Sequence, residues 1–224
     1  MNRARSQIRA VSFDVGGTLL RPRGSVGRIY ADVAAEWGFP GLPPETLRQR
    51  FRTAWRARPI FNHSRAEWAE LVDAAFAGFV PVPPSRTFFG ELYRRFAFPK
   101  AWEVFPDALP TLRALKHHGL RLAVISNWDQ RLRPLLRRLR LLGLFDAVVV
   151  SGEVGFAKPS PAIFEIAARR LRLSPNEILH VGDEPGSDLR GAREAGCQAA
   201  LLARGRHSSS SGSISSLHTL EKLL

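Results

Sequence analysis

The hydrophobic positions along the chain change their spacing twice. Residues 8–15 are apolar at nearly every position after Arg9, which predicts a strand buried on both faces. Short apolar runs return in the second half, at residues 120–125, 147–150, 178–181 and 198–203. Helical patterns separate these runs, at residues 107–118, 129–142, 160 onward and 188–195. Strands that alternate with helices of this length predict a parallel, doubly wound α/β sheet with right-handed crossovers.

Residues 23–98 show helical spacing and no convincing strand pattern. Apolar residues from Val26 onward recur three and four positions apart, and Pro44 stands where a second helix begins. Ser64 and Glu67 have the spacing of a capping box at the start of a third helix, and a fourth begins at Ser85. Amphipathic helices need one another to bury their apolar faces, so this segment is predicted to form a small helical bundle.

The chain is therefore predicted to have a Rossmann-like sheet core with an inserted, all-helical cap. The core comprises residues 1–22 and 99–224, and the cap comprises residues 23–98. Near the C-terminal end of the core, residues 206–216 are rich in serine, which predicts a flexible linker. A short closing helix is expected after it, at residues 217–224.

The composition is that of a globular protein. With 224 residues, of which 45% are hydrophobic and 24% charged, the chain can bury one sizeable core. No apolar run approaches the roughly 20 residues that span a bilayer, and we do not expect the N-terminal segment to be a signal peptide. The single cysteine, Cys197, excludes an internal disulfide and is expected to be a small buried apolar residue. We therefore expect a cytoplasmic protein without a membrane partner.

The net charge of +13 suggests a nucleic-acid partner only at first sight. Arginine supplies 29 of the 33 basic residues, a skew typical of genome composition rather than of a binding patch. In the densest basic run, residues 131–140, arginines alternate with leucines at helical spacing, as on the exposed face of an amphipathic helix. We therefore expect no nucleic-acid partner, and the sequence leaves the oligomeric state open.

Polar residues suited to phosphate chemistry follow the predicted strands. An aspartate at a strand end is more often a cap or turn former than a catalyst, and this holds for Asp14 taken alone. In a parallel sheet, however, ligands bind beyond the carboxyl ends of the strands. Further residues of this kind stand at later strand ends or before the next helix: Ser126, Asn127, Lys158, Asp183 and Asp188. Together they are typical of a phosphoryl-transfer site.

Asp14 is the candidate nucleophile, because a carboxylate can accept a phosphoryl group and form an aspartyl-phosphate. A phosphate monoester carries about two negative charges near neutral pH, so attack by an anion requires neutralisation. Lys158 is the candidate for this role, since a compact ammonium fits between a carboxylate and a phosphate where a guanidinium is too large. Ser126 and Asn127, between a strand and a helix, are candidates for binding the phosphate oxygens.

Asp14, Asp183 and Asp188 are also the candidate ligands of a magnesium ion. Three carboxylates supply the oxygen ligands that Mg²⁺ prefers. Asp183 directly follows a buried strand, which makes its position the more specific of the two later acids. Asp188 is equally suited to cap a helix, and Glu184 is an alternative ligand.

The motifs resemble those of a known family. The chain is similar to the haloacid dehalogenase-like (HAD) hydrolase superfamily, in the branch with a helical cap inserted after the first motif. The resemblance extends over residues 9–224. Its four motifs appear in order as Phe13-Asp14-Val15-Gly16-Gly17-Thr18-Leu19, Val124-Ile125-Ser126-Asn127, Lys158-Pro159 with Pro161, and Val181-Gly182-Asp183 with Asp188 and Gly191-Ala192.

This resemblance implies a Mg²⁺-dependent hydrolase of small phosphorylated metabolites that acts through an aspartyl-phosphate. Asp14 and Lys158 would be the catalytic residues, as nucleophile and charge neutraliser. The substrate would be bound by Ser126, Asn127 and Thr18. The metal would be held by Asp14, by the backbone carbonyl of Gly16, and by Asp183 and Asp188.

Gly16 departs from the pattern of the family's phosphatases. These enzymes usually carry a second aspartate two residues after the nucleophile, which protonates the leaving alcohol and then activates the hydrolytic water. Gly16 keeps the backbone carbonyl but lacks the carboxyl group. General acid–base catalysis is typically worth about 10²–10⁴-fold, so we expect turnover to be slow or to depend on another proton donor. Water is one such donor and His63 of the cap is another.

Three other functions stay open. A 2-haloacid dehalogenase also lacks the second aspartate, but it binds no metal, ends in a different last motif and carries a tyrosine where Gly16 stands. A phosphonate hydrolase can have a small residue there, but it needs a cap lysine, and no lysine precedes Lys100. A binding or regulatory protein would keep the fold and have lost turnover.

Overall fold

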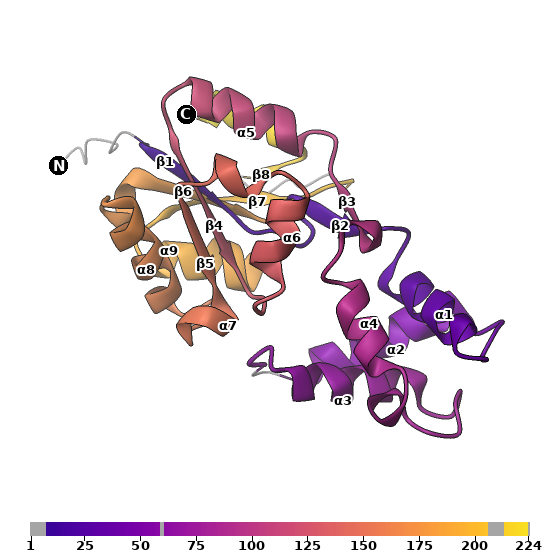
Figure 1. Ribbon diagram of the computed structural model, residues 1–224. Coiled ribbons are helices and arrows are strands. Elements are labelled where there is room, and N and C mark those ends of the chain that lie inside the picture. Colours follow the sequence, from indigo (N-terminus) through magenta and orange to yellow (C-terminus); the bar gives the residue numbers. More distant parts are fainter. Residues whose placement is uncertain (1–7, 59–60, 206–212, 224) are drawn as a thin grey trace. The chain divides into compact units, whose positions relative to one another are not determined.

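The computed structural model describes residues 8–58, 61–205 and 213–223. Its main feature is a sheet whose strands are ordered β5-β4-β1-β6-β7-β8 (Figure 1). Each neighbouring pair in this order is parallel. The strands are β1 (Ala10–Phe13), β4 (Arg121–Ser126), β5 (Ala147–Val150), β6 (Ile178–Gly182), β7 (Gln198–Leu202) and β8 (Ser213–Ile214).

Helices follow the strands and cover both faces of the sheet, with α5 and α8 on opposite sides (Figure 1). The helices are α5 (Ala108–His117), α6 (Leu132–Arg138), α7 (Ser151–Val154), α8 (Pro161–Leu171) and α9 (Gly191–Glu194). A π-helical turn spans Pro185–Arg190, and 3₁₀ turns span Leu142–Leu144, Pro175–Glu177 and Leu217–Leu223. The predicted doubly wound α/β core is thereby confirmed.

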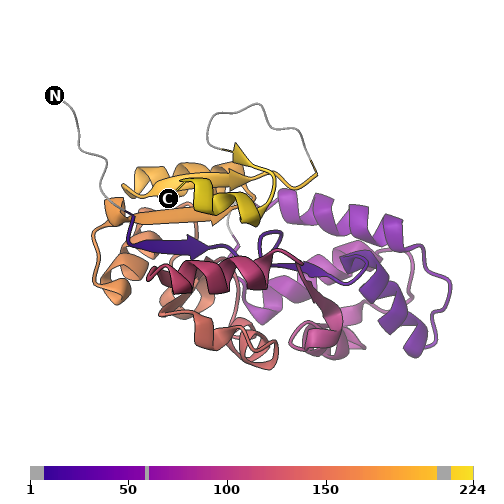
Figure 2. The ribbon, with the colours of Figure 1, turned by 90° about the horizontal axis from the view of Figure 1, so that it is seen from above.

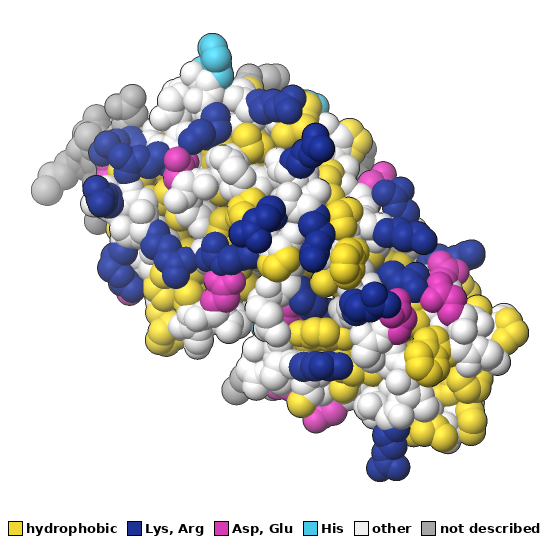
Figure 3. Space-filling view, viewed as in Figure 1, with side chains coloured by type: hydrophobic (Ala, Val, Ile, Leu, Met, Phe, Trp, Pro, Cys, Tyr) yellow, Lys and Arg dark blue, Asp and Glu magenta, His cyan; other side chains and the backbone are white. Residues whose placement is uncertain are grey.

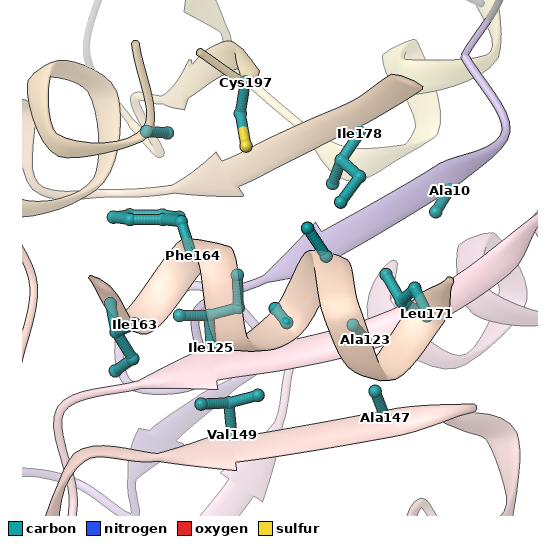
Figure 4. Close-up of a cluster of buried hydrophobic side chains, with 13 residues drawn as sticks. Ala10, Ala123, Ile125, Ala147, Val149, Ile163, Phe164, Leu171, Ile178 and Cys197 are labelled. Carbon is teal, nitrogen blue, oxygen red and sulfur yellow. The ribbon is translucent and has the colours of Figure 1, made fainter. Parts of the chain in front are cut away.

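The packing of α8 on the sheet follows from the alternation of side chains along the strands. Ala123 and Ile125, two positions apart on β4, lie on the face of the sheet that α8 covers, with Ile125 near Phe164 and Ala123 near Leu171 (Figure 4). Cys197 belongs to this cluster, and burial raises the pKa of its thiol to about 12. Burying a side chain the size of Phe164 stabilises the fold by about 1.5–3 kcal/mol. These contacts therefore help to hold the strands whose carboxyl ends carry the candidate site residues.

The insert between β1 and α5 is built mainly of helices, as predicted. It contains α1 (Val26–Glu36), α2 (Pro44–Arg56), α3 (Arg65–Phe76), α4 (Phe89–Arg95) and 3₁₀ turns at Pro84–Arg86 and Pro99–Ala101. Tyr30 stacks on Phe76, with ring centroids 5.7 Å apart, in a core shared by all four α-helices. Ser64 caps α3 by accepting the N–H of Glu67, but the Glu67 carboxylate accepts from Asn62 instead of closing the box.

The chain divides into two compact units. One comprises Met1–Leu20 and Val104–Leu224, and the other comprises Arg21–Glu103. The second unit is thus longer at both ends than the cap limits of 23–98 expected from the sequence. Two short strands that the sequence analysis missed, β2 (Leu20–Pro22) and β3 (Trp102–Val104), pair where the chain passes between the units.

Several elements are shorter than expected. The strand at 8–15 is ordered as β1 over Ala10–Phe13 only. The helix expected at 129–142 ends at Arg138, because Arg140 adopts a left-handed backbone conformation with φ of 58°. The helix expected at 188–195 is a π-helical turn followed by the short α9.

The C-terminal segment also differs from its prediction. Residues 206–212 of the expected linker lie outside the described residues, but Ser213–Ile214 form β8 rather than a linker, because they pair with β7. The expected closing helix is a 3₁₀ helix that lies beside α5 (Figure 2). Asp107, at the start of α5, holds this segment: its Oδ2 accepts from the hydroxyl of Ser216 at 2.8 Å and from the N–H of Leu217 at 2.9 Å. Its carboxylate also pairs with Arg204 at 2.8 Å.

Basic side chains are spread over the surface. On the face shown in Figure 3, Lys and Arg are interspersed with hydrophobic and other polar groups. Several arginines are paired with acids, for example Arg9 with Glu177 at 2.9 Å and Arg133 with Glu153 at 2.8 Å. In the described parts of the chain, no helix is both long and apolar enough to cross a membrane.

Candidate active site

Three neighbouring central strands place candidate site residues together at their carboxyl ends. In the order β4-β1-β6, Ser126 is the last residue of β4, Asp14 directly follows β1, and Asp183 directly follows β6. The N–H of Asp14 still bonds to the carbonyl of Val181 at 2.9 Å, which extends the pairing of β1 with β6 by one residue. The three polar side chains therefore lie beside one another, as expected for the carboxyl ends of parallel strands.

Asp14 is held by two donors on one of its oxygens. Its Oδ1 accepts a hydrogen bond from the hydroxyl of Ser126 at 2.9 Å and from the ammonium of Lys158 at 2.7 Å. The residue is only 8% exposed. Burial raises the pKa of Asp14, since the charge of Lys158 offsets only part of the burial and the negative charge of Asp188 adds to it. None of the described residues donates a hydrogen bond to Oδ2, the other oxygen of Asp14.

Lys158 bridges two carboxylates. Its Nζ lies 2.7 Å from Oδ1 of Asp14 and 2.5 Å from Oδ1 of Asp188. Burial lowers the pKa of Lys158, but the two carboxylates outweigh burial, so the pKa lies above its ordinary value and the ammonium is charged. For Asp188, burial is outweighed by the charge of Lys158 and by the bond from His180, so its pKa is lowered. Asp188 is therefore an anion that anchors the ammonium.

Asn127 contacts the backbone of Lys158 on both polar atoms of its side chain. Its Nδ2 donates to the carbonyl of Lys158 at 2.9 Å, and its Oδ1 accepts the N–H of Lys158 at 2.7 Å. This pair joins the end of β4 to the loop before α8. Asn127 therefore positions Lys158, and its predicted contact with a substrate stays a prediction.

Asp183 lies over the turn that follows Asp14. Thr18 is buried and its hydroxyl donates to Oδ1 of Asp183 at 3.3 Å, whereas the sequence analysis assigned Thr18 to the substrate. Gly17 has a positive φ of 80°, and a Cβ there would lie 2.2 Å from Oδ2 of Asp183. Glycine is therefore required at this position both by conformation and by the closeness of the carboxylate.

The charges of the acidic cluster fit a divalent cation. Oxygen atoms of Asp14, Asp183 and Asp188 all lie within 4.8 Å of one another. Burial, followed by the charges of Asp14, Asp188 and Glu184, raises the pKa of Asp183 to about 7. Lys158 alone does not balance three carboxylates, so the cluster retains negative charge and offers the oxygen ligands that suit Mg²⁺.

A pair of buried residues that the sequence analysis did not select supports Asp188. Ser12 of β1 and His180 of β6 are opposite one another in the sheet, and Ser12 Oγ lies 2.9 Å from His180 Nδ1. The other ring nitrogen, Nε2, lies 3.3 Å from Oδ1 of Asp188. Because Asp188 is an acceptor only and burial lowers the pKa of His180, we assign the neutral ring with its proton on Nε2 and the Ser12 hydroxyl as donor to Nδ1.

The fold and this arrangement define a class of protein. A parallel α/β sheet with a helical insert, and with acids, a serine and a lysine gathered at its strand ends, is typical of hydrolases. A family model described as a haloacid dehalogenase-like hydrolase matches residues 8–196. The chain belongs to this family of hydrolases, as the sequence motifs predicted.

Curated relatives agree with this assignment. The chain is 38% identical over 209 residues to haloacid dehalogenase-like hydrolase domain-containing protein 3 of Homo sapiens, which covers 88% of this chain and 83% of the relative. The name of this relative is that of the superfamily whose motifs the sequence resembles, so the resemblance is confirmed. Glyceraldehyde 3-phosphate phosphatase of Methanopyrus kandleri is 40% identical over 114 residues, covering 50% of this chain and 48% of the relative.

Solved structures share the fold. The crystal structure of a HAD phosphatase from Thermococcus onnurineus is 27% identical, covers 96% of this chain and 97% of its own, and superposes with a TM-score of 0.70. A 2-haloacid dehalogenase from Pseudomonas syringae pv. Tomato DC3000 is 25% identical, covers 97% and 98%, and gives a TM-score of 0.67. Both phosphatases and dehalogenases therefore adopt this architecture, and the residues of the site have to decide between them.

Proposed function

We propose that this protein is a Mg²⁺-dependent hydrolase of small phosphate monoesters that works through a phosphorylated Asp14. The observation that carries the proposal is the bridge of Lys158 between Asp14 and Asp188, with Asp183 beside it. A carboxylate nucleophile next to a buried ammonium and surplus carboxylates suits a substrate that is itself a dianion.

In the first step, Oδ2 of Asp14 attacks phosphorus, and the bond from phosphorus to the leaving-group oxygen breaks. Oδ1 stays bonded to Ser126 and Lys158, which fixes the plane of the carboxylate during attack. The ammonium of Lys158 opposes the negative charge that the phosphoryl group brings to Asp14. The leaving oxygen receives its proton from water, because Gly16 offers none.

In the second step, water attacks the phosphorus of the aspartyl-phosphate and the bond from phosphorus to Oδ2 of Asp14 breaks. The attacking water passes one proton to the hydroxide left by the first step and keeps the other on the phosphate. Inorganic phosphate leaves and Asp14 is restored as a carboxylate. Asp14, Asp183 and the carbonyl of Gly16 are the groups that would hold Mg²⁺, and Asp188 supports them through Lys158. Bound there, the ion would supply Lewis-acid stabilisation of the phosphoryl oxygens.

A phosphatase assay with a matched variant tests this proposal. We expect hydrolysis of p-nitrophenyl phosphate in the presence of Mg²⁺ and a loss of at least about 10³-fold in Asp14→Asn, because the amide is a poor nucleophile. Asp32→Asn removes an exposed acid that pairs with Arg28 on α1 and should leave the rate unchanged. The second readout is beryllofluoride with Mg²⁺, which should raise the thermal unfolding temperature of the wild type but not of Asp14→Asn. Absence of both turnover and this stabilisation would refute the proposal.

Two observations keep other functions testable. Gly16 favours a binding or regulatory protein without turnover, and stabilisation by beryllofluoride without hydrolysis of any phosphoester would support it. Likeness to a dehalogenase structure favours a metal-independent 2-haloacid dehalogenase, for which release of chloride from 2-chloropropionate in the presence of a chelator is the test. We favour the phosphatase because the carboxylates around Asp14 and Lys158 suit a metal, which the dehalogenase reaction does not require.

A further inference from the structure

The two glycines that follow Asp14 in the turn, Gly16 and Gly17, lie next to side chains of different chemistry. A Cβ on Gly17 would lie against the carboxylate of Asp183. A Cβ on Gly16 would lie 3.7 Å from Cζ3 of the Trp128 indole, with no other non-adjacent atom of the described residues within 4 Å. The turn thus has an acidic side at Gly17 and an aromatic side at Gly16.

The backbone of Trp128 is fixed in place by the first turn of α7. Its N–H donates to Oγ of Ser151 at 3.0 Å, and its carbonyl accepts from Oγ of Ser151 at 3.1 Å and from the N–H of Gly152 at 2.9 Å. The following residue, Asp129, is buried and paired with Arg131 at 2.6 Å. Trp128 is half-buried, and its indole lies beside Gly16, two residues after the serine that binds Asp14.

An aromatic wall and a missing carboxyl group favour the same kind of leaving group. An indole can stack on a ring, but it supplies no proton to a departing alkoxide. A phenolate or a similar stabilised anion departs without a proton donor, whereas an alkoxide depends on one. Both features therefore disfavour simple alkyl phosphates. An alkyl group cannot stack on the indole of Trp128, and an alkoxide finds no proton donor at Gly16.

We propose that Gly16 and Trp128 form a leaving-group subsite for aryl or comparably apolar, ring-bearing phosphate esters. This inference rests on the proposed function, since it needs the phosphoryl group placed at Asp14. The ester oxygen then lies beside Gly16, and the ring that it carries packs on the indole of Trp128.

Binding of phosphonates tests the subsite without any turnover. Phenylphosphonate and methylphosphonate carry the same anionic group and differ only in the ring, so the ratio of their dissociation constants isolates the ring contact. With Mg²⁺ present, calorimetry on the wild type should give about tenfold tighter binding of phenylphosphonate, since stacking adds to the burial of the ring. Trp128→Ala should bring the ratio close to one while leaving methylphosphonate binding unchanged.

Three variants control this measurement. Trp128→Phe keeps an aromatic face and should retain most of the preference. Trp128→Leu keeps an apolar side chain and serves in place of alanine if Trp128→Ala does not fold. Trp37→Ala removes a tryptophan that is 51% exposed on the other unit and should change nothing.

The possible results separate the subsite from the proposed function. If the wild type binds both phosphonates equally, or if Trp128→Ala keeps the preference, the subsite is refuted and the phosphatase proposal stands. If the wild type binds neither phosphonate, the subsite is refuted, and hydrolysis of p-nitrophenyl phosphate together with stabilisation by beryllofluoride decides separately whether the phosphatase proposal stands.

Discussion

At the scale of single residues, Gly16 sets the limit on catalysis in the proposed reaction. The position does not need glycine for its backbone, because its φ lies outside the left-handed region, and a Cβ there would make an ordinary contact with Trp128. The missing carboxyl group is therefore a difference in chemistry that the fold does not impose. A side chain can be added here and its effect measured.

We predict that Gly16→Asp speeds hydrolysis of alkyl phosphates by about 10²-fold and hydrolysis of p-nitrophenyl phosphate much less. The added acid protonates an alkoxide, whereas p-nitrophenolate hardly needs a proton. Rates for glycerol phosphate and p-nitrophenyl phosphate, measured with the same preparations, check this. Gly16→Asn has the same size without the acid and should give no gain; equal gains for both substrates would mean that proton transfer is not the limit.

We predict that Asp183 makes the stability of the metal-free protein depend on pH. Its folded pKa of about 7 exceeds the ordinary value of 3.8, so between these values the folded state binds a proton that the unfolded state has released. The free energy of unfolding should therefore fall as pH rises from about 4 to about 7 and level off above. In Asp183→Asn this fall should be smaller, and the part that remains should come from groups such as Asp14, whose pKa is also raised. Thermal unfolding in the presence of a chelator checks the difference between the two proteins, and parallel profiles would contradict it.

The sequence was sufficient to select the acids, the serine and the lysine of the site but not their support. Asp14, Ser126, Lys158 and Asp188 stand at strand ends or in the loops beyond them, and the structure brings them into contact. His180 was missed because it lies within an apolar strand. The available signal was a histidine opposite a serine in two adjacent buried strands, and it needs the strand register to be recognised.

At the scale of elements, the parallel pairing of β1 with β6 places Ser12 against His180. Both residues are fully buried, and the pair carries a polar connection from the interior of the sheet to Asp188. Such a pair stabilises the register only while it is intact, because a buried polar group that loses its partner is costly.

We predict that Ser12→Ala lowers the free energy of unfolding by about 1–3 kcal/mol, since it removes the partner of Nδ1 of His180 in the interior. His180→Leu should cost a similar amount. The double variant should cost less than the sum, since the two residues interact directly. Urea unfolding of the wild type, the two single variants and the double variant measures this interaction. Ser160→Ala is the control, because the Ser160 side chain makes no cap hydrogen bond. Strict additivity would mean that the contact contributes no energy.

Element type was predictable from the sequence where the hydrophobic period was clear, and element length was not. Strands β4 to β7 and helices α5 and α8 match their apolar runs to within a residue or two. The early end of α6 depends on the left-handed conformation of Arg140, a residue without a turn preference. β8 was missed because two residues of a serine-rich segment carry no strand pattern, and only pairing with β7 creates the strand.

At the scale of the whole molecule, one carboxylate joins three distant parts of the core unit. Asp107 pairs with Arg204, and Arg204 also donates to the carbonyl of Thr18 at 2.8 Å. Asp107 in addition holds Ser216 and Leu217 near the C-terminus. Burial alone would raise the pKa of Asp107, but Arg204 and the other donors outweigh it and lower the pKa. The C-terminal segment is thus tied to the turn that carries Asp14.

We predict that Asp107→Ala lowers the free energy of unfolding by about 3 kcal/mol, because it leaves Arg204 without its buried partner. The contribution of Asp107 to the free energy of unfolding should be fully present above its ordinary pKa of 3.8. It should be lost as the pH falls through the lower pKa that Asp107 has in the folded protein. Urea unfolding at neutral pH, together with hydrogen exchange of residues 213–223, measures the loss. Asp32→Ala, an exposed acid, is the control. Unchanged exchange in this segment would show that Asp107 does not hold it.

The empty side-chain position at Gly16 has a practical consequence for the study of this protein. A Cβ at Gly16 would have only Cζ3 of Trp128 within 4 Å among the non-adjacent atoms of the described residues, so we expect a small acid from solution to be able to reach this position. Formate, acetate or imidazole in the buffer can then donate the proton that Gly16 does not supply. Rates of hydrolysis of alkyl phosphates should therefore rise with buffer concentration at constant pH. Rates measured in different buffers are then not directly comparable.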